Sequence, residues 1–334
     1  MRRARLALLI AVMMTAAVVT VALAFEREEP LGPPVRAAAS TEWRSLAPAG
    51  LERTEVAAAR IGRSIYVVGG FEKRSGLTTG ALERYDIRTN RWTRLRSMPV
   101  GLNHPTATAY RGKFYVHGGY MGRRDLSSAT ARLFVYNPRT NRWARLPKSA
   151  RPRAAHALAV LGGRLYAFGG KNDRGEMRSM EVYSFARRRW RAAPAMKGPP
   201  RDHMTGLAAG GFLYALAGRD LTNGPGNFAT AERYSPRRRR WERLPSMRKA
   251  RGGIASARLS GGRVIVFGGE ESAGTIREVE LFEPRRRRWR SLPDMKTPRH
   301  GLGGVSLGDR VYSIQGGPRP GFFFSNAIEY LDVD

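Results

Sequence analysis

The chain of 334 residues contains no cysteine, and this absence excludes several kinds of chemistry. It rules out disulfides, zinc-thiolate sites, a thiol nucleophile and the lipid-modified cysteine of a bacterial lipoprotein. Acidic residues are also scarce, because 27 Asp and Glu stand against 59 Lys and Arg, for a formal net charge of +32. Only seven of those 59 are Lys, which leaves 52 Arg. Such a charge favours anionic partners, although it says nothing about the fold.

Hydrophobic residues make up 42% of the chain and aromatic residues 9%. This content supplies a sizeable core and excludes wholesale disorder despite the charge.

The N-terminal segment, residues 1–25, has the pattern of an export signal or a membrane anchor. Three arginines among the first five residues precede an apolar run, residues 6–25. The small residues Ala22 and Ala24 allow cleavage after Ala24, and the run is also long enough to span a bilayer uncleaved. Both alternatives place the remainder outside the cytoplasm, secreted or anchored. Residues 26–40, rich in Pro and Ala, are expected to form a linker.

One pattern accounts for nearly all of the chain after Thr41. An apolar run that ends in glycine recurs six times, and the first position of the glycine pair falls at residues 69, 118, 169, 217, 268 and 316. These positions are 48 to 51 residues apart, and residue 217 is Ala in a degraded copy. An aromatic residue follows each run, at Tyr85, Tyr136, Tyr183, Tyr234, Phe282 and Tyr330. In the first five copies a Trp follows that aromatic by seven residues, at Trp92, Trp143, Trp190, Trp241 and Trp289.

Each repeat contains four short stretches rich in β-branched and aromatic residues, which predict four strands, a to d, and almost no helix. The first repeat is expected to have strands at residues 56–60, 64–70, 82–87 and 92–95. Trp43 occupies a strand d position with no strands a to c before it, whereas the sixth repeat ends at strand c. The N-terminal strand around Trp43 should therefore complete the last sheet and close a ring of six.

These glycine, tyrosine and tryptophan spacings resemble Kelch repeats over residues 41–334. The resemblance implies an all-β, six-bladed Kelch-type β-propeller. It also implies that the face carrying the b–c loops and the d-to-a connections is the ligand or partner site.

The arginines fall into two sets on such a propeller. The first set lies in the c–d turns, including residues 187–189, 237–240 and 285–288, and rings one face with charge. That face is either a platform for acidic envelope polymers or simply a solvated surface.

The second set lies on the opposite face, where five of the six d-to-a connections carry an Arg at one repeat position: Arg53, Arg153, Arg201, Arg251 and Arg299. Leu102 stands there in the second repeat. A ring of guanidinium groups suits carboxylate or phosphate recognition, so we predict these residues as ligand-binding. The alternative is that they pair within the repeat with Glu83, Glu181, Glu232 and Glu280.

The b–c loops differ from repeat to repeat and are expected to carry specificity. From these loops we add Arg123, Arg219 and Phe323 to the candidate ligand-binding residues. Residues 322–324 are three consecutive phenylalanines, which predict either an aromatic contact for a partner or a lid on the channel mouth.

No catalytic or metal-binding pattern is apparent. Four of the five histidines, His104, His156, His203 and His300, lie in d-to-a connections, but we find neither equivalent positions nor a metal-ligand spacing. We therefore expect no metal and no cofactor. The copper radical oxidases among Kelch-type propellers need a Tyr crosslinked to Cys and are excluded. A sialic-acid-like mutarotase or epimerase is the enzymatic alternative.

The sequence thus predicts a binding module rather than an enzyme. Its expected partner is an anionic protein, peptide or glycan, bound through the Arg-lined face. Nucleic acid is disfavoured by the export signal, membrane contact is expected only through the N-terminal segment, and we expect a monomer.

Overall fold

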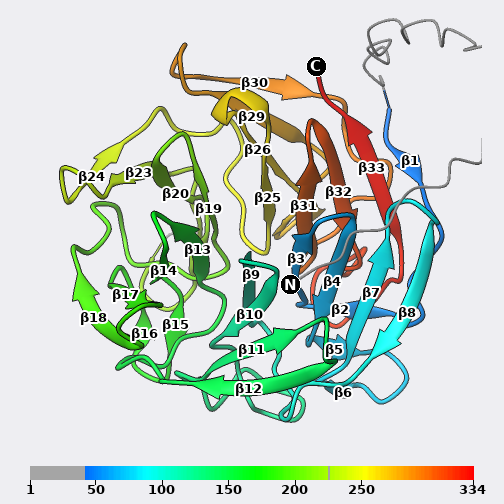
Figure 1. The fold of residues 1–334 in the computed structure, drawn as a ribbon. Helices are drawn as coiled ribbons and strands as arrows, with labels where there is room; N and C mark the ends of the chain where they lie inside the picture. Colours follow the sequence, from blue (N-terminus) through cyan, green and yellow to red (C-terminus); the bar gives the residue numbers. More distant parts are fainter. Residues whose placement is uncertain (1–41, 225) are drawn as a thin grey trace, which may run out of the picture. The chain divides into compact units, whose positions relative to one another are not determined.

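The computed structural model describes residues 42–224 and 226–334, so the predicted signal or anchor and the linker lie outside the described residues. Within these ranges the strands form six four-stranded antiparallel sheets, with one 3-10 turn, η1 (Ser260–Gly262). The described part has no helix that is long and apolar enough to cross a membrane. The first strand of each sheet packs on the first strand of the next, and the sixth returns to the first (Figure 1). The all-β propeller prediction is confirmed.

We number the sheets as repeats 1 to 6 in chain order. Repeats 1 and 2 contain β3 (Ala57–Ile61), β4 (Ser64–Val68), β7 (Leu82–Asp86), β8 (Arg91–Leu95), and β9 (Thr106–Tyr110), β10 (Lys113–His117), β11 (Leu133–Asn137), β12 (Arg142–Leu146). Repeats 3 and 4 contain β13 (Ala157–Leu161), β14 (Arg164–Phe168), β17 (Met180–Ser184), β18 (Arg189–Ala193), and β19 (Thr205–Ala209), β20 (Phe212–Leu216), β23 (Ala231–Ser235), β24 (Arg240–Arg243). Repeats 5 and 6 contain β25 (Ala255–Arg258), β26 (Val264–Phe267), β29 (Val279–Glu283), β30 (Arg288–Leu292), and β31 (Gly303–Leu307), β32 (Arg310–Ile314), β33 (Ile328–Asp332), β1 (Arg44–Ser45).

Short hairpins extend the b–c loops and were not predicted. Strands β2 (Arg53–Thr54), β5 (Phe71–Glu72) and β6 (Leu77–Thr78) form a three-stranded sheet beside repeat 1. The others pair β15 (Lys171–Asn172) with β16 (Gly175–Glu176), β21 (Arg219–Asp220) with β22 (Gly226–Asn227), and β27 (Glu270–Glu271) with β28 (Gly274–Thr275). These hairpins give the loops of one face a regular backbone.

The seven-residue spacing places each strand c aromatic directly opposite its Trp, as in the pair Tyr85 and Trp92. The Trp side chain also reaches back to the preceding repeat, because its indole N–H donates to a carbonyl there. Trp92 donates to Ala47 O at 2.8 Å, and Trp241 to Pro194 O at 2.8 Å. Each Trp thus joins neighbouring sheets by packing and by one hydrogen bond.

The predicted closure is confirmed, with a shift of one residue. β1 pairs with β33 through Arg44 opposite Tyr330, which places Leu331, and not the predicted Tyr330, at the position facing Trp43. Leu331 and Trp43 share one core cluster. The glycine-pair position moves in the same way, since Gln315 and Gly316 adopt the left-handed conformation in repeat 6.

The glycine pair is required where two connections approach each other closely. Gly118 has φ +66°, and a Cβ there would stand 2.2 Å from Arg153 O. A side chain at this position would be strained and would also collide with the backbone of the next repeat.

Candidate functional site

The antiparallel strand order sorts the loops onto two faces. The a–b and c–d turns lie at one end of every sheet, which we call the turn face. The b–c loops and the d-to-a connections lie at the other end, around the central channel, which we call the mouth face.

All five predicted channel arginines are fully buried and paired with glutamates. Each guanidinium lies 2.8 to 3.0 Å from a carboxylate oxygen, in the pairs Arg53–Glu83, Arg153–Glu181, Arg201–Glu232, Arg251–Glu280 and Arg299–Glu329. The side chains of Arg201 and Glu232 are both 0% exposed. The pairing alternative therefore describes the structure, and these five arginines offer no surface to a ligand.

Each pair pins a d-to-a connection to its own sheet. Arg53 Nη1 donates to Gly69 O at 3.1 Å and to Ala81 O at 2.9 Å, while Glu232 accepts from the backbone N–H groups of Lys197 and Gly198. Burial lowers the pKa of Arg53 to about 10, so the guanidinium remains charged near neutral pH. The arginines are structural components of the repeat.

Repeat 2 replaces the pair by an apolar one. Leu102 stands at the arginine position, and Phe134 stands at the glutamate position, opposite Val116 as Glu83 is opposite Val67. Both side chains are 0% exposed and belong to one core cluster. The chain therefore contains its own example of the repeat without the ion pair.

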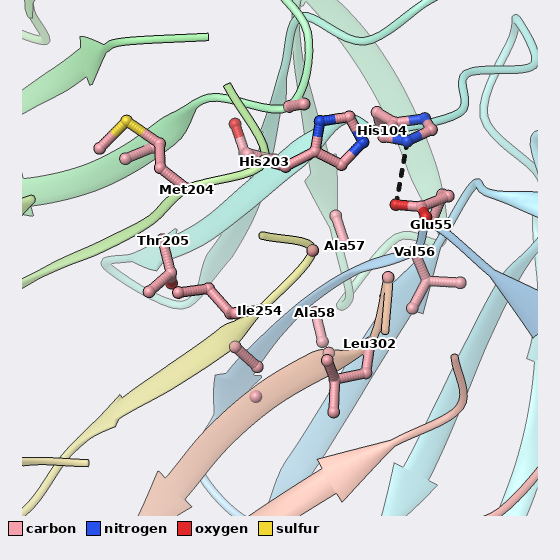
Figure 2. A pocket seen from close by; sticks show the side chains of 18 of the residues that line it. Glu55, Val56, Ala57, Ala58, His104, His203, Met204, Thr205, Ile254 and Leu302 are labelled. Atoms are coloured by element: carbon pink, nitrogen blue, oxygen red, sulfur yellow. Dashed lines mark ion pairs between the residues drawn. The ribbon is translucent and has the colours of Figure 1, made fainter. Parts of the chain in front are cut away.

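A ring of six residues with positive φ surrounds the mouth of the channel. Two residues after each arginine position stand Glu55, His104, Ala155, His203, Gly253 and Gly301, with φ between 45° and 70°. Their backbones are linked around the ring; for example, His104 N donates to Glu55 O at 3.1 Å and Gly253 N to His203 O at 2.9 Å. Three of these positions carry ionisable side chains, and all three point into one cluster (Figure 2).

Glu55 is the centre of this cluster. Its Oε2 lies 3.1 Å from His104 Nε2, and its Oε1 lies 3.1 Å from His300 Nδ1. Burial alone would raise the pKa of Glu55, but the surrounding histidines hold it well below its usual range. Burial likewise opposes the charge on His300, but the hydrogen bond with Glu55 raises the pKa of His300. Burial lowers the pKa of His104 to about 3. Glu55 is therefore held in its ionised form, while burial opposes a positive charge on His104.

Two cavities adjoin the ring. One, of about 150 Å³, lies in the channel and is lined by the strand a residues of all six repeats. The other, of about 100 Å³, lies at the mouth and is lined by Glu55, His104, His203, His300, Arg219, Leu126 and Phe322, among others. The mouth thus combines buried ionisable groups with an apolar rim.

The predicted loop residues are placed differently from one another. Arg219 lines the mouth cavity and is engaged by Glu270, with Nη1 2.7 Å from Oε1. Arg123 is exposed on its loop. Phe323 is 43% exposed, with the Arg319 guanidinium over its ring. Phe322 lines the outer side of the mouth cavity and packs on Phe71, with ring centroids 4.8 Å apart. The phenylalanine run therefore supplies both an exposed aromatic and a cover.

The convergence of Glu55, His104 and His203 was not predicted from the sequence. The conclusion that the histidines lack equivalent positions is wrong for His104 and His203, which stand at the same repeat position. The signal was available, because counting two residues on from each arginine position lands on both histidines and on Glu55. The three residues are found by aligning equivalent positions of the repeats, because no short spacing in the sequence links them.

A separate pair of buried histidines predicts loss of stability in acid. His117 Nδ1 lies 2.9 Å from His156 Nε2, and burial lowers the pKa of His117 to about 3. The unfolded state binds the proton near pH 6.5, so the free energy of unfolding falls as the pH drops from 6.5 towards 3. In His117→Phe, which copies Phe168 and Phe267 of repeats 3 and 5, this slope should decrease by about 1.4 kcal/mol per pH unit. Urea unfolding followed by Trp fluorescence between pH 7 and 4 measures it, and equal slopes would contradict the assignment.

The comparisons with known proteins agree with the fold. A family described as the KLHDC2/KLHL20/DRC7 Kelch-repeats domain matches residues 37–218 and 103–317. Kelch-like protein terF of Aspergillus terreus is 30% identical over 232 residues, 65% of this chain and 50% of that protein. Beta-scruin of Limulus polyphemus is 29% identical over 48% of this chain and 18% of its own length. This chain therefore spans half or less of these relatives. The solved structure titled "Structure of YjhT" superposes with a TM-score of 0.73 at 16% identity, covering 86% of this chain and 97% of that one.

Proposed function

Because the chain belongs to the Kelch-repeat family, whose domains are protein-binding modules in general, we propose that it binds an acidic protein or peptide segment through the mouth face. One observation carries the proposal. Among the described residues, the exposed large hydrophobic side chains are Leu126 (49%), Leu221 (66%), Phe322 (52%) and Phe323 (43%), and all four lie in b–c loops of this face. Leu126 and Phe322 also line the mouth cavity. Exposed apolar side chains on one face, two of them beside a cavity, are typical of an interaction site.

The charge around these side chains selects the chemistry of the partner. Arg123, Arg124 and Arg319 are exposed in the same loops, and Arg174 is exposed in the b–c loop of repeat 3. A segment that presents carboxylates beside Leu or aromatic residues would meet both features, with apolar anchors in the centre and ion pairs at the rim.

Replacing the apolar rim should abolish this binding. We expect the triple change Leu126→Ser, Leu221→Ser and Phe322→Ser to weaken binding of an acidic, aromatic-containing peptide at least about tenfold, since buried anchors dominate such interfaces. Fluorescence anisotropy with peptides from an array measures the change, with the same peptides carrying Gln for each acid as a comparison. Arg238→Ser with Arg286→Ser, on the turn face, is the matched control and should bind normally. Unchanged binding in the triple variant, or binding of glycans alone on a parallel glycan array, would contradict the proposal.

The turn face supports a second candidate function, adhesion to acidic envelope polymers. Its c–d turns carry runs of exposed arginines, including residues 237–240 and 285–288. Adhesion of this kind would fall steeply with salt, would survive the triple change on the mouth face and would be lost in the turn-face control.

A sugar-acid isomerase is the enzymatic alternative. The five buried arginines cannot bind the carboxylate of its substrate, because each is paired with a glutamate. Turnover of a carboxylated sugar that is lost in Arg219→Ala would support it. We further propose, from residues 1–25 alone, that the module acts outside the cytoplasm, which protease accessibility in intact cells tests.

A further inference from the structure

We propose that Glu55, His104 and His203 form a binding site for one divalent transition-metal ion, with Zn²⁺ as the expected occupant. One ligand atom from each residue lies within 4.8 Å of the other two. Ligands of a tetrahedral Zn²⁺ lie about 3.4 Å apart, so the most distant pair of ligand atoms needs to converge by up to about 1.4 Å. All three stand at the same repeat position, in repeats 1, 2 and 4, where repeats 3, 5 and 6 carry Ala155, Gly253 and Gly301.

The hydrogen bonds around His104 leave its Nε2 as a lone-pair donor to a cation. Asn103 Nδ2 lies 2.8 Å from Thr78 Oγ1 and 3.2 Å from the Asp125 carbonyl oxygen, so this atom is the amide nitrogen. Asn103 Oδ1 therefore faces His104 Nδ1, at 2.8 Å, and accepts its proton. A ring that carries its single proton on Nδ1 turns the lone pair of Nε2 towards the Glu55 carboxylate, 3.1 Å away. Two acceptors at this distance require a cation or a second proton between them.

His203 has a related setting two repeats further around the ring, where its Nδ1 lies beside a carboxylate without a hydrogen bond to it. Its Nδ1 lies 3.0 Å from Oδ1 of the preceding residue, Asp202, which stands where Asn103 precedes His104. Figure 2 shows the other ring nitrogen of His203 turned towards His104. A carboxylate or amide beside the second nitrogen is the usual support of a metal-bound histidine, because it fixes the ring orientation and the tautomer.

The charge balance of the mouth also favours a cation. Glu55, Asp202 and Glu270 are at most 9% exposed, and Arg219 is the guanidinium beside them, 2.7 Å from Glu270 and 3.9 Å from Asp202. Three buried carboxylates against one guanidinium leave an excess of negative charge, which His300 offsets only in part. Buried charge that is not compensated is costly, so a divalent ion would stabilise the cluster.

Two nitrogens and one oxygen favour Zn²⁺, or another late first-row ion, over Ca²⁺ and Mg²⁺, which prefer oxygen ligands. Three protein ligands leave a fourth position, and both cavities adjoin it. The three ligands line the same mouth cavity as Leu126 and Phe322, but the metal site does not require that a peptide binds there.

The test is a Zn²⁺ titration of the full chain, purified without a histidine tag and treated with a chelator, against a chromogenic competitor. We expect one equivalent to bind tightly, and the Kd to rise at least about tenfold in each of Glu55→Gln, His104→Gln and His203→Gln. Co²⁺ in place of Zn²⁺ should give visible absorption bands of a four- or five-coordinate site, and these bands should be lost in the same variants.

Glu52→Gln, an exposed acid of the same connection, is the matched control for Glu55→Gln, and His117→Phe is the control for the histidines. Both should bind Zn²⁺ like the unmodified chain. Circular dichroism confirms that each variant is folded, and Asn103→Ala, which leaves the three ligands in place, should give an intermediate Kd. Absence of stoichiometric binding, or equal binding in the unmodified chain and the folded ligand variants, would overturn the proposal.

Discussion

Replacing Arg201 with Ala is expected to lower the free energy of unfolding by about 3–5 kcal/mol. The Arg201 and Glu232 side chains are both 0% exposed, with Nη2 2.9 Å from Oε1. Without the guanidinium, the carboxylate of Glu232 would remain buried with only the backbone N–H groups of Lys197 and Gly198 as partners. Urea unfolding followed by Trp fluorescence measures the loss.

The same chain supplies the compensating variant. Arg201→Leu combined with Glu232→Phe copies Leu102 and Phe134 of repeat 2, which are buried in one core cluster. Because a well-packed apolar pair can replace a buried ion pair at little cost, the double variant should recover at least half of the stability lost in Arg201→Ala. The recovery should be incomplete, since Ala217 O and the two backbone N–H groups lose their side-chain partners.

An exposed pair provides the control for this prediction. Lys73 and Glu52 lie 2.8 Å apart, but their side chains are 58% and 38% exposed. Lys73→Ala should therefore cost about 1 kcal/mol or less. Equal losses in Lys73→Ala and Arg201→Ala would show that the repeat pairs do not hold the connections as described.

Replacing Trp43 with Ala should cost a comparable 3–5 kcal/mol and should also open the ring. Trp43 is 3% exposed, packs on Phe267 with ring centroids 5.5 Å apart, and donates its indole N–H to Pro293 O at 3.1 Å. It therefore joins the N-terminal strand to repeat 5 while β1 pairs with β33 of repeat 6. Its loss removes core packing and loosens β1, whose residues Arg44 and Ser45 pair with β33 to complete the last sheet.

Trp143→Ala is the matched control, because Trp143 makes the same type of hydrogen bond, to Arg96 O, but is only half-buried and joins repeats 1 and 2 away from the closure. We expect a smaller loss of stability there. Opening of the ring in Trp43→Ala would also expose the edge of β33, so size-exclusion chromatography should show concentration-dependent association for this variant alone. A stability loss no greater than that of Trp143→Ala, with no association, would contradict the role of Trp43 in closure.

The sequence by itself determined the strand plan, the number of repeats and the closure by Trp43. These features depend on spacings within one repeat, and a seven-residue spacing between Tyr85 and Trp92 allows a single hairpin register. In repeat 6 the motif is degenerate, and the prediction erred there by one residue, taking Tyr330 for Leu331. Local hydrogen-bonding geometry is thus readable from a repeated pattern where the pattern is intact.

Only the tertiary structure decided which side chains face solvent and which meet across repeats. A recurring Arg is equally compatible with a ligand-binding ring and with a buried ion pair, because its side chain is long enough to reach either position. The fold decides for the ion pair, since it places the Glu83 carboxylate 2.9 Å from the Arg53 guanidinium. Glu55, His104 and His203 are separated by 49 and 99 residues and converge only because the connections of the closed ring point towards one channel. The sequence specifies each repeat through short-range spacing, but the chemistry of the mouth depends on where the ring brings the repeats together.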